Sequence, residues 1–233
     1  MSPSETWTAV HRRGPAGEFH ALEVPEGVRR ELWWFEVDRP ALVLGSTQPE
    51  ETVDRSACEA AGVDVVRRRS GGGSVLMLPG EMVWLDVVVG RDDPLWDDDI
   101  GRATWWLGEV WRTALAGLGA PEPVVHQGAM VANAWSKTVC FAGLGPGEVT
   151  VGRAKLLGLS QRRTRSWARL QCGVHLRWRP DVVASLLAPL PSPLSSPLSS
   201  RPSSDDLAPL VAAIDAPVSA IEAAVEAALP VTG

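Results

Sequence analysis

Three consecutive arginines and three consecutive glycines stand together in the segment VVRRRSGGGSV, at positions 65–75. Glycine lacks a Cβ atom and tolerates positive φ, so Gly71, Gly72 and Gly73 mark a place where another molecule can lie against the main chain. The amides of such a loop can cradle an anion, and guanidinium groups at positions 67–69 can bind phosphate or carboxylate. The segment is not a Walker loop, since no G-K-[ST] follows. A hairpin tip with solvated charges is the alternative interpretation.

Lysine is rare in this chain. Of the 22 basic residues, only Lys137 and Lys155 are lysines. Arginine keeps a forked, permanently charged group, whereas lysine offers a compact ammonium that acts as a point donor. This bias favours a specific task for a retained lysine, and the alternative is that both lysines are incidental surface residues.

The three cysteines, Cys58, Cys140 and Cys172, are odd in number and far apart. This pattern indicates reduced thiols rather than a disulfide framework. Cys140 or Cys172 could act as a nucleophile, although a single cysteine more often fills a buried apolar position. The four histidines show no spacing with cysteines or carboxylates that is typical of a zinc site. We therefore expect no metal.

The composition is that of an ordinary globular protein. The chain has 233 residues, of which 45% are hydrophobic and 21% are charged, so we expect one domain of catalytic size. A net charge of -6 argues against nucleic-acid binding, which depends on a basic face. The N-terminus lacks the pattern of a signal peptide, and the chain has no apolar run of about eighteen residues, so we expect a cytoplasmic protein without membrane contact.

Strand and helix patterns surround the glycine segment. Short connections join most of the expected strands, and few helices lie between them. This order predicts an α+β fold with a mixed, largely antiparallel sheet flanked by helices. Strands are expected at 31–37, 41–45, 63–66, 82–89, 148–160 (two runs about a turn at Gly152) and 168–178, and helices from Thr52 to 61 and from Ile100 to Leu118.

The composition changes near the C-terminus. Residues 190–206 are rich in proline and serine and are expected to form a linker. Residues 1–189 would then be the catalytic domain. Residues 207–233 would form a helical tail, broken at Pro217, that docks on this domain and is too short to be a second one.

Three motifs in order resemble the biotin/lipoate protein ligase superfamily, specifically its lipoate-protein ligases and octanoyltransferases. They are VVRRRSGGGSV at 65–75, VCFAGLGPGEVTVGRAKLLGLSQRR at 139–163 and LQCGVHL at 170–176. The resemblance covers roughly residues 30–180. It implies a mixed sheet flanked by helices, and transfer of an octanoyl or lipoyl group to a lysine of a lipoyl domain or of the glycine cleavage H protein.

The resemblance also implies the site residues. Lys155 matches the essential lysine of the family, which holds the activated acyl carbonyl. Cys140 lies in a VCF segment that carries the nucleophile in one transferase branch, and a neighbouring lysine ammonium would favour its thiolate. Residues implied to bind the acyl substrate are Arg68, Ser70, Gly71, Gly72, Gly73, Ser74, Val75, Leu76 and Gly158.

Two other functions stay open within this resemblance. An ATP-dependent ligase would use ATP and Mg²⁺ and pass through an acyl-adenylate, whereas a transferase would need no tightly bound cofactor. A non-catalytic relative would bind an acyl chain or an adenylate without turnover. Departures from the family motifs motivate this last alternative, and they are Met77 and Leu78 in place of a histidine-aspartate pair, Glu81 in place of an asparagine, Ala154 in place of a basic residue, and Cys172 in place of a histidine.

The expected partners are acidic proteins. They are a lipoyl-domain or H-protein acceptor and, for the transferase, an acyl carrier protein as donor. A group of arginines is a candidate surface for such a partner, with an ordinary solvated charge run as the alternative. Its members are Arg162, Arg163, Arg165 and Arg169.

Overall fold

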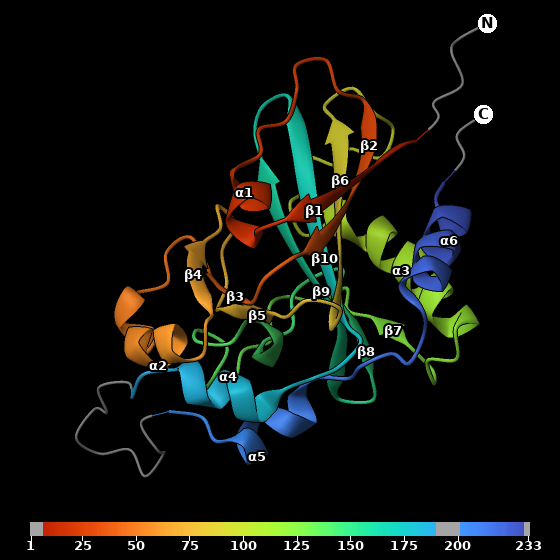
Figure 1. The fold of residues 1–233 in the computed structure, drawn as a ribbon. Helices are drawn as coiled ribbons and strands as arrows, with labels where there is room; N and C mark the ends of the chain where they lie inside the picture. The colour runs from red at the N-terminus through yellow and green to blue at the C-terminus, as the bar shows by residue number, and fades with distance from the viewer. Residues whose placement is uncertain (1–6, 190–200, 231–233) are drawn as a thin grey trace, which may run out of the picture.

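A large mixed sheet forms the centre of the molecule. The computed structural model describes residues 7–189 and 201–230. The sheet has seven strands in the order β1 (Thr8–Gly14), β2 (Arg30–Val37), β6 (Met82–Gly90), β10 (Trp167–His175), β9 (Ala154–Arg163), β8 (Val149–Val151) and β7 (Val124–Val125) (Figure 1). Strands β1 and β2 are parallel, and the other neighbouring pairs of this sheet are antiparallel. The expected mixed, largely antiparallel sheet is confirmed.

A smaller sheet carries the glycine segment. Its order is β4 (Asp64–Arg67), β3 (Ala41–Leu44) and β5 (Val75–Met77), with β3 parallel to β4 and antiparallel to β5. Strands β4 and β5 therefore flank β3 and do not pair with each other. The segment between them crosses the end of β3, so the hairpin-tip interpretation is wrong.

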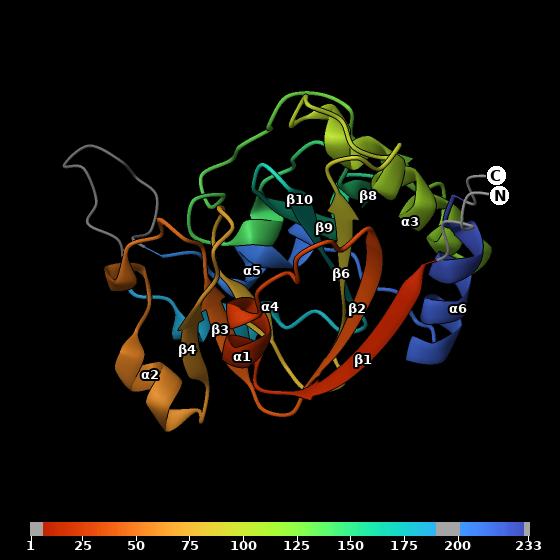
Figure 2. The same ribbon diagram turned by 90° about the horizontal axis from the view of Figure 1, so that it is seen from above.

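Helices cover both faces of the large sheet (Figure 2). The α-helices are α1 (Ala16–Ala21), α2 (Arg55–Ala60), α3 (Trp105–Gly117), α4 (Pro180–Leu186), α5 (Ser204–Leu207) and α6 (Val218–Ala228). Short 3₁₀ helices are η1 (Glu50–Thr52), η2 (Arg102–Thr104), η3 (Cys140–Ala142) and η4 (Ala208–Leu210). Helices α3 and α6 lie on one side of the large sheet, and the small sheet with α1 and α2 lies on the other.

The alternation of side chains along the strands builds two separate cores. Successive residues of a strand point to opposite faces, so Val83 and Leu85 of β6 join the core under α3 and α6, whereas Trp84 and Val88 face the small sheet. The second core also holds Met77 of β5. This face of the large sheet carries the site described below.

Two helices begin later than expected. Helix α2 begins after Asp54, whose side chain accepts a hydrogen bond from the backbone N–H of Ala57 at 2.9 Å, a capping contact that Thr52 does not make. The segment from Ile100 is a turn followed by η2, because the Asp99 carboxylate accepts hydrogen bonds from the N–H groups of Gly101 and Arg102. Regular α3 therefore starts at Trp105.

The C-terminal segment packs into the same core as the sheet. Helix α6 begins directly after Pro217, and its Ile221 and Val225 are fully buried against α3. Before it, the N–H of Ala212 donates to the backbone carbonyl of Lys155 at 2.9 Å. Residues 190–200 of the expected linker lie outside the described residues, and α5 begins within its last part. Within the described ranges, no helix is long and apolar enough to cross a membrane.

Candidate functional site

The glycine segment is packed against the protein itself at two of its three glycines. A Cβ atom on Gly45 would lie 1.8 Å from the carbonyl oxygen of Gly72, and one on Gly73 would lie 2.6 Å from the backbone nitrogen of Val139. Gly72 also has a φ of +97°, which side chains disfavour. By contrast, a Cβ on Gly71 would meet no atom within 4 Å, and Gly71 lines an open groove. Close packing therefore accounts for Gly72 and Gly73, whereas a side chain at Gly71 would point into open space.

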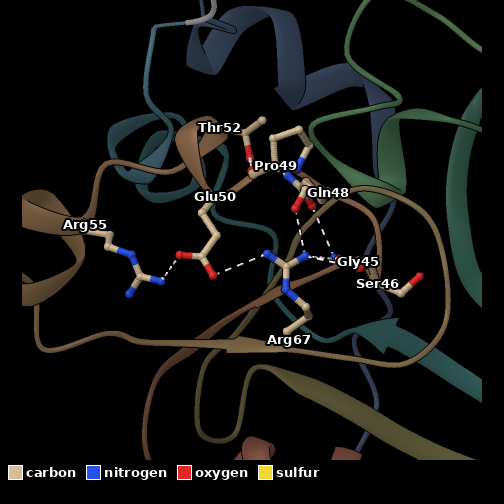
Figure 3. A network of polar contacts seen from close by, with 8 residues as sticks. All are labelled: Gly45, Ser46, Gln48, Pro49, Glu50, Thr52, Arg55 and Arg67. Carbon is tan, nitrogen blue, oxygen red and sulfur yellow. Dashed lines mark hydrogen bonds and ion pairs between the residues drawn. The ribbon is translucent and has the colours of Figure 1, made fainter.

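Arg67 stabilises the turn at residues 45–48, which packs against the glycine segment (Figure 3). One Nη atom donates to the carbonyl oxygens of Gly45 and Gln48, both at 2.7 Å. The other lies 3.5 Å from a carboxylate oxygen of Glu50, which also pairs with Arg55. The Arg67 donors therefore serve two backbone carbonyls and the Glu50 carboxylate of the protein itself.

Arg68 points into the glycine segment and is buried. Its Nη2 atom donates to the carbonyl oxygens of Gly71 at 2.7 Å and Gly73 at 2.8 Å, and it lies 3.6 Å from the Sγ atom of Cys140. None of its contacts among the described residues is a carboxylate. Arg69, by contrast, forms an exposed ion pair with Glu23. Of the three arginines, Arg68 alone contacts a candidate nucleophile.

Cys140 is held beside the glycine segment by backbone bonds. The N–H of Cys140 donates to the carbonyl of Ser74 at 3.0 Å, and the N–H of Ser74 donates to the carbonyl of Thr138 at 2.8 Å. These bonds pair the start of β5 with the residues before η3. A Cβ on Gly72 would lie 3.3 Å from the Cys140 sulfur, so the thiol rests against the loop.

Lys155 is buried beside Cys140 at the start of β9. Its Nζ atom donates to the Cys140 carbonyl at 3.0 Å and pairs with the Glu148 carboxylate at 2.7 Å. Glu148 also accepts from the N–H of Gly145 at 2.6 Å and the N–H of Leu159 at 3.0 Å. The ammonium is therefore fixed in one place, and its charge is balanced by a carboxylate that the sequence motifs did not single out.

Two cavities meet at Cys140. A narrow, mostly apolar pocket runs between the small sheet and strands β6, β9 and β10, and its lining includes Val43, Val75, Met77, Met82, Trp84, Phe141, Leu159, Cys172 and Gly173. A wider, open groove is lined by residues that include the glycine triplet, Glu148 and Lys155. Cys140, Leu159 and Ser160 line both. The thiol thus stands at the junction of a pocket suited to an aliphatic chain and a groove open to a partner.

The expected substrate residues divide between these cavities and the core. Arg68, Val75 and Gly158 line the apolar pocket, and Gly71, Gly72 and Gly73 line the groove. Ser70 lines neither cavity; its hydroxyl donates to the Gln171 side chain at 2.8 Å and accepts from the hydroxyl of Ser160, which lines both.

Ser74 and Leu76 line neither of these cavities. Ser74 Oγ donates to the Thr138 carbonyl, and Leu76 packs with Leu42 and Val183 in a third core beneath α2 and α4. The alternation along β5 explains this, since Val75 and Met77 take the opposite face.

The departures from the family motifs have structural roles. Cys172 is 1% exposed, and burial raises the pKa of its thiol, which makes it a wall residue rather than a nucleophile. Met77 adds an apolar side chain to the same pocket. Glu81 lies outside this pocket, where it pairs with Arg179 at 2.7 Å.

A buried polar network beneath the pocket was not expected from the sequence. Arg169 is 2% exposed and pairs with the buried Asp86 at 2.5 Å, so it does not belong to a surface that receives an acidic partner. Its other donors reach the carbonyls of Phe19 and Leu22 and fix α1 to the sheet. His20 of α1 lines the pocket, and burial with nearby Arg68 lowers its pKa to about 3.

The sequence gives only weak signals for Glu148 and Gly173 as residues of the site. Glu148 is a single acidic residue ahead of the lysine hairpin, and Gly173 lies within the LQCGVHL motif without a stated role. Across β9 and β10, Gly173 pairs with Gly158, and added Cβ atoms would collide with Met82 and Phe141 respectively. Within the described residues, no three histidine, cysteine or acidic side chains gather as a metal site.

Comparisons with known proteins show the family of this chain. Residues 18–204 match the family described as lipoyl protein ligase A/B catalytic domain. The chain is 23% identical over 167 residues to an octanoyltransferase LipM of Clostridioides difficile, covering 67% of this chain and 60% of the relative. It is 27% identical over 171 residues to an octanoyltransferase LipM of Moorella thermoacetica, covering 69% and 62%. The chain thus spans about three fifths of the length of these relatives.

Solved structures share the fold. A lipoate protein ligase of Thermoplasma acidophilum with bound lipoic acid, described as putative, has a TM-score of 0.69 at 16% identity, covering 97% of this chain and 84% of that one. Lipoate-protein ligase A bound with ATP has a TM-score of 0.68 at 17% identity, covering 96% and 83%. A bipartite ligase from T. acidophilum, studied with its E2 lipoyl domain, has a TM-score of 0.67 at 15% identity, covering 95% and 80%. Since the family match spans most of the chain and the fold agrees, this protein belongs to the lipoyl protein ligase A/B catalytic domain family.

Proposed function

We propose that this protein transfers an octanoyl or lipoyl group to a lysine of a lipoyl-domain acceptor through a thioester on Cys140. The observation that carries the proposal is the position of the Cys140 thiol, which stands where the apolar pocket meets the open groove. The pocket would hold the aliphatic chain, and the groove would admit first the acyl donor and then the acceptor lysine. The relatives named octanoyltransferase support this reaction class.

The first step loads the enzyme. The Cys140 thiolate attacks the carbonyl carbon of an acyl thioester on a carrier protein, a new carbon–sulfur bond forms, and the carrier thiol leaves with a proton from water. Arg68 supplies the positive charge nearest the sulfur. Lys155, fixed beside the Cys140 carbonyl, would stabilise the negative charge that develops on the acyl oxygen.

The second step unloads it. The neutral amine of the acceptor lysine attacks the Cys140 thioester, an amide bond forms, the Cys140 thiolate leaves, and the amine loses a proton to water. Glu148 is a positioning residue in this scheme. It holds Lys155 in place, and none of its contacts among the described residues is with the Cys140 sulfur. The acidic acceptor would dock over the groove, whose rim exposes Ile100 and Met130.

The placement of the arginines favours a thioester donor over ATP and a free acid. In the ATP-dependent alternative, nucleotide phosphates would need positive donors beside the glycine segment, and Mg²⁺ would need oxygen ligands there. One Nη atom of Arg67 and both Nη atoms of Arg68 donate instead to backbone carbonyls. The other Nη atom of Arg67 lies beside the Glu50 carboxylate, and Arg69 pairs with Glu23. We therefore place the carrier thioester first among the donors.

Intact mass measurement tests the proposal. After incubation with octanoyl-acyl carrier protein, the protein should gain one octanoyl group that hydroxylamine removes. The Cys140→Ser variant should lose this hydroxylamine-labile adduct, and Cys172→Ser, the matched control in the pocket wall, should keep it. An adduct that persists in Cys140→Ser, or acceptor modification that requires ATP and free octanoate, would reject the thioester route.

A further inference from the structure

Met82 lies where three cavities meet. It lines the apolar pocket, a small cavity beside Trp178, and a surface groove between β1, β2 and the start of α6. Among the residues that line these cavities, Met82 is the one that all three share. Met82 therefore separates the apolar pocket from this surface groove, which is a different groove from the one at Lys155.

The Met82 side chain closes the pocket over paired glycines. A Cβ on Gly173 would lie 2.3 Å from the Met82 methyl carbon and 3.8 Å from the ring of Phe141. Phe141 follows Cys140 in η3, and its ring fills the space that Gly158 leaves on β9. An acyl chain that starts at the Cys140 sulfur would thus pass Phe141 and then reach Met82.

Met82 is the movable part of the wall between the apolar pocket and the surface groove. Trp84 is the other residue common to the pocket and the surface groove, but its Nε1 donates to Asp86 at 2.7 Å and its ring packs on His20 and Phe35. Methionine is unbranched and flexible, and Met82 is only partly buried. A rotation of Met82 could join the pocket to the groove, whereas Trp84 is held in place.

We propose that Met82 sets the maximum length of the acyl chain. With Met82 across Gly173, the pocket ends after a medium chain, and a small residue at this position would let a longer chain continue into the surface groove. The chemistry of loading rests on the proposed function. The selectivity of the pocket for chain length does not rest on that function, because binding of free fatty acids should show the same preference.

The test compares Met82→Ala with Met77→Ala. Both variants enlarge the same pocket by the same change, but Met77 does not line the surface groove. Loading of Cys140 is measured by intact mass with carrier proteins that hold octanoyl, dodecanoyl or tetradecanoyl groups. We expect Met82→Ala to raise the ratio of tetradecanoyl to octanoyl loading rates by roughly tenfold or more, and Met77→Ala to raise it much less.

A binding measurement separates the two proposals. Displacement of a fluorescent fatty acid by octanoate and tetradecanoate is measured with the same variants and with Met82→Phe, which should weaken octanoate binding. If selectivity shifts in binding while no variant is loaded, the role of Met82 stands and the proposed function fails. Unchanged selectivity in Met82→Ala, or an equal shift in Met77→Ala, would overturn the role of Met82.

Discussion

The Nη2 atom of Arg68 lies 3.6 Å from the Sγ atom of Cys140. Lys155, for which the resemblance implies a place at the acyl carbonyl, binds the Cys140 carbonyl and the Glu148 carboxylate. The two cations therefore have separate places: Arg68 lies at the sulfur, and Lys155 lies at the backbone carbonyl of Cys140. In the proposed mechanism, Arg68 would serve the sulfur and Lys155 the oxyanion that forms on the acyl group.

Arg68→Met should slow alkylation of Cys140 by iodoacetamide at neutral pH by about tenfold, because thiolate reactivity depends on nearby positive charge. Mass mapping assigns the label to Cys140. Arg67→Met is the matched control, since Arg67 also donates to backbone carbonyls of this region but does not contact the sulfur. Equal rates in wild type and Arg68→Met would contradict the role of Arg68.

The two ends of the glycine triplet should respond differently to alanine. Gly73→Ala would force a Cβ to within 2.6 Å of the Val139 nitrogen and should lower the free energy of unfolding by about 1–3 kcal/mol and displace Cys140. Gly71→Ala should change it by less than about 0.5 kcal/mol, because no atom lies within 4 Å. Urea denaturation measures both, and equal losses would mean that the packing of Gly73 is not the reason for the triplet.

Lys155 and Glu148 should be strongly coupled in stability. Both side chains are 4% exposed, so Glu148→Gln leaves a buried ammonium without its partner and should cost about 3–5 kcal/mol. Lys155→Met in the Glu148→Gln background should recover part of this loss. A double-mutant cycle by urea denaturation measures the coupling, and strict additivity would show that the pair is not a unit.

Two buried histidines should make the protein less stable in acid. Burial lowers the pKa of His175 to about 4 and that of His20 to about 3, below the usual value of 6.5. Below pH 6.5 these histidines are protonated in the unfolded chain but stay neutral in the folded protein. The free energy of unfolding therefore falls as the pH drops from about 6.5 towards about 4.

His175→Phe tests the acid dependence. The ring of His175 lies between those of Phe141 and Trp178, so phenylalanine fits the same contacts. Between pH 7 and pH 5, wild type should lose about 2 kcal/mol more than this variant, because the variant lacks one proton uptake on unfolding. Parallel pH curves for the two proteins would show that His175 does not titrate in this way.

The motifs singled out residues of rare types and gave no sign of residues that come together through long-range packing. Cys140, Lys155 and the glycine triplet were identifiable because rare residue types stand within ordered motifs. Asp86 and Arg169 come together only through the pairing of β6 with β10, which local periodicity does not determine. Likewise, the patterns predicted strands on both sides of the glycine segment but could not show that β3 lies between them.

The most direct test of the account follows the acyl group itself. The protein is loaded from octanoyl-acyl carrier protein, freed of donor by desalting, and mixed with an unmodified lipoyl domain without ATP. Rapid quenching and intact mass should show octanoyl leaving Cys140 and appearing on the acceptor lysine at one common rate. If the thioester stays in place or goes only to water, while the acceptor is modified only with ATP and free octanoate, the central claim is contradicted.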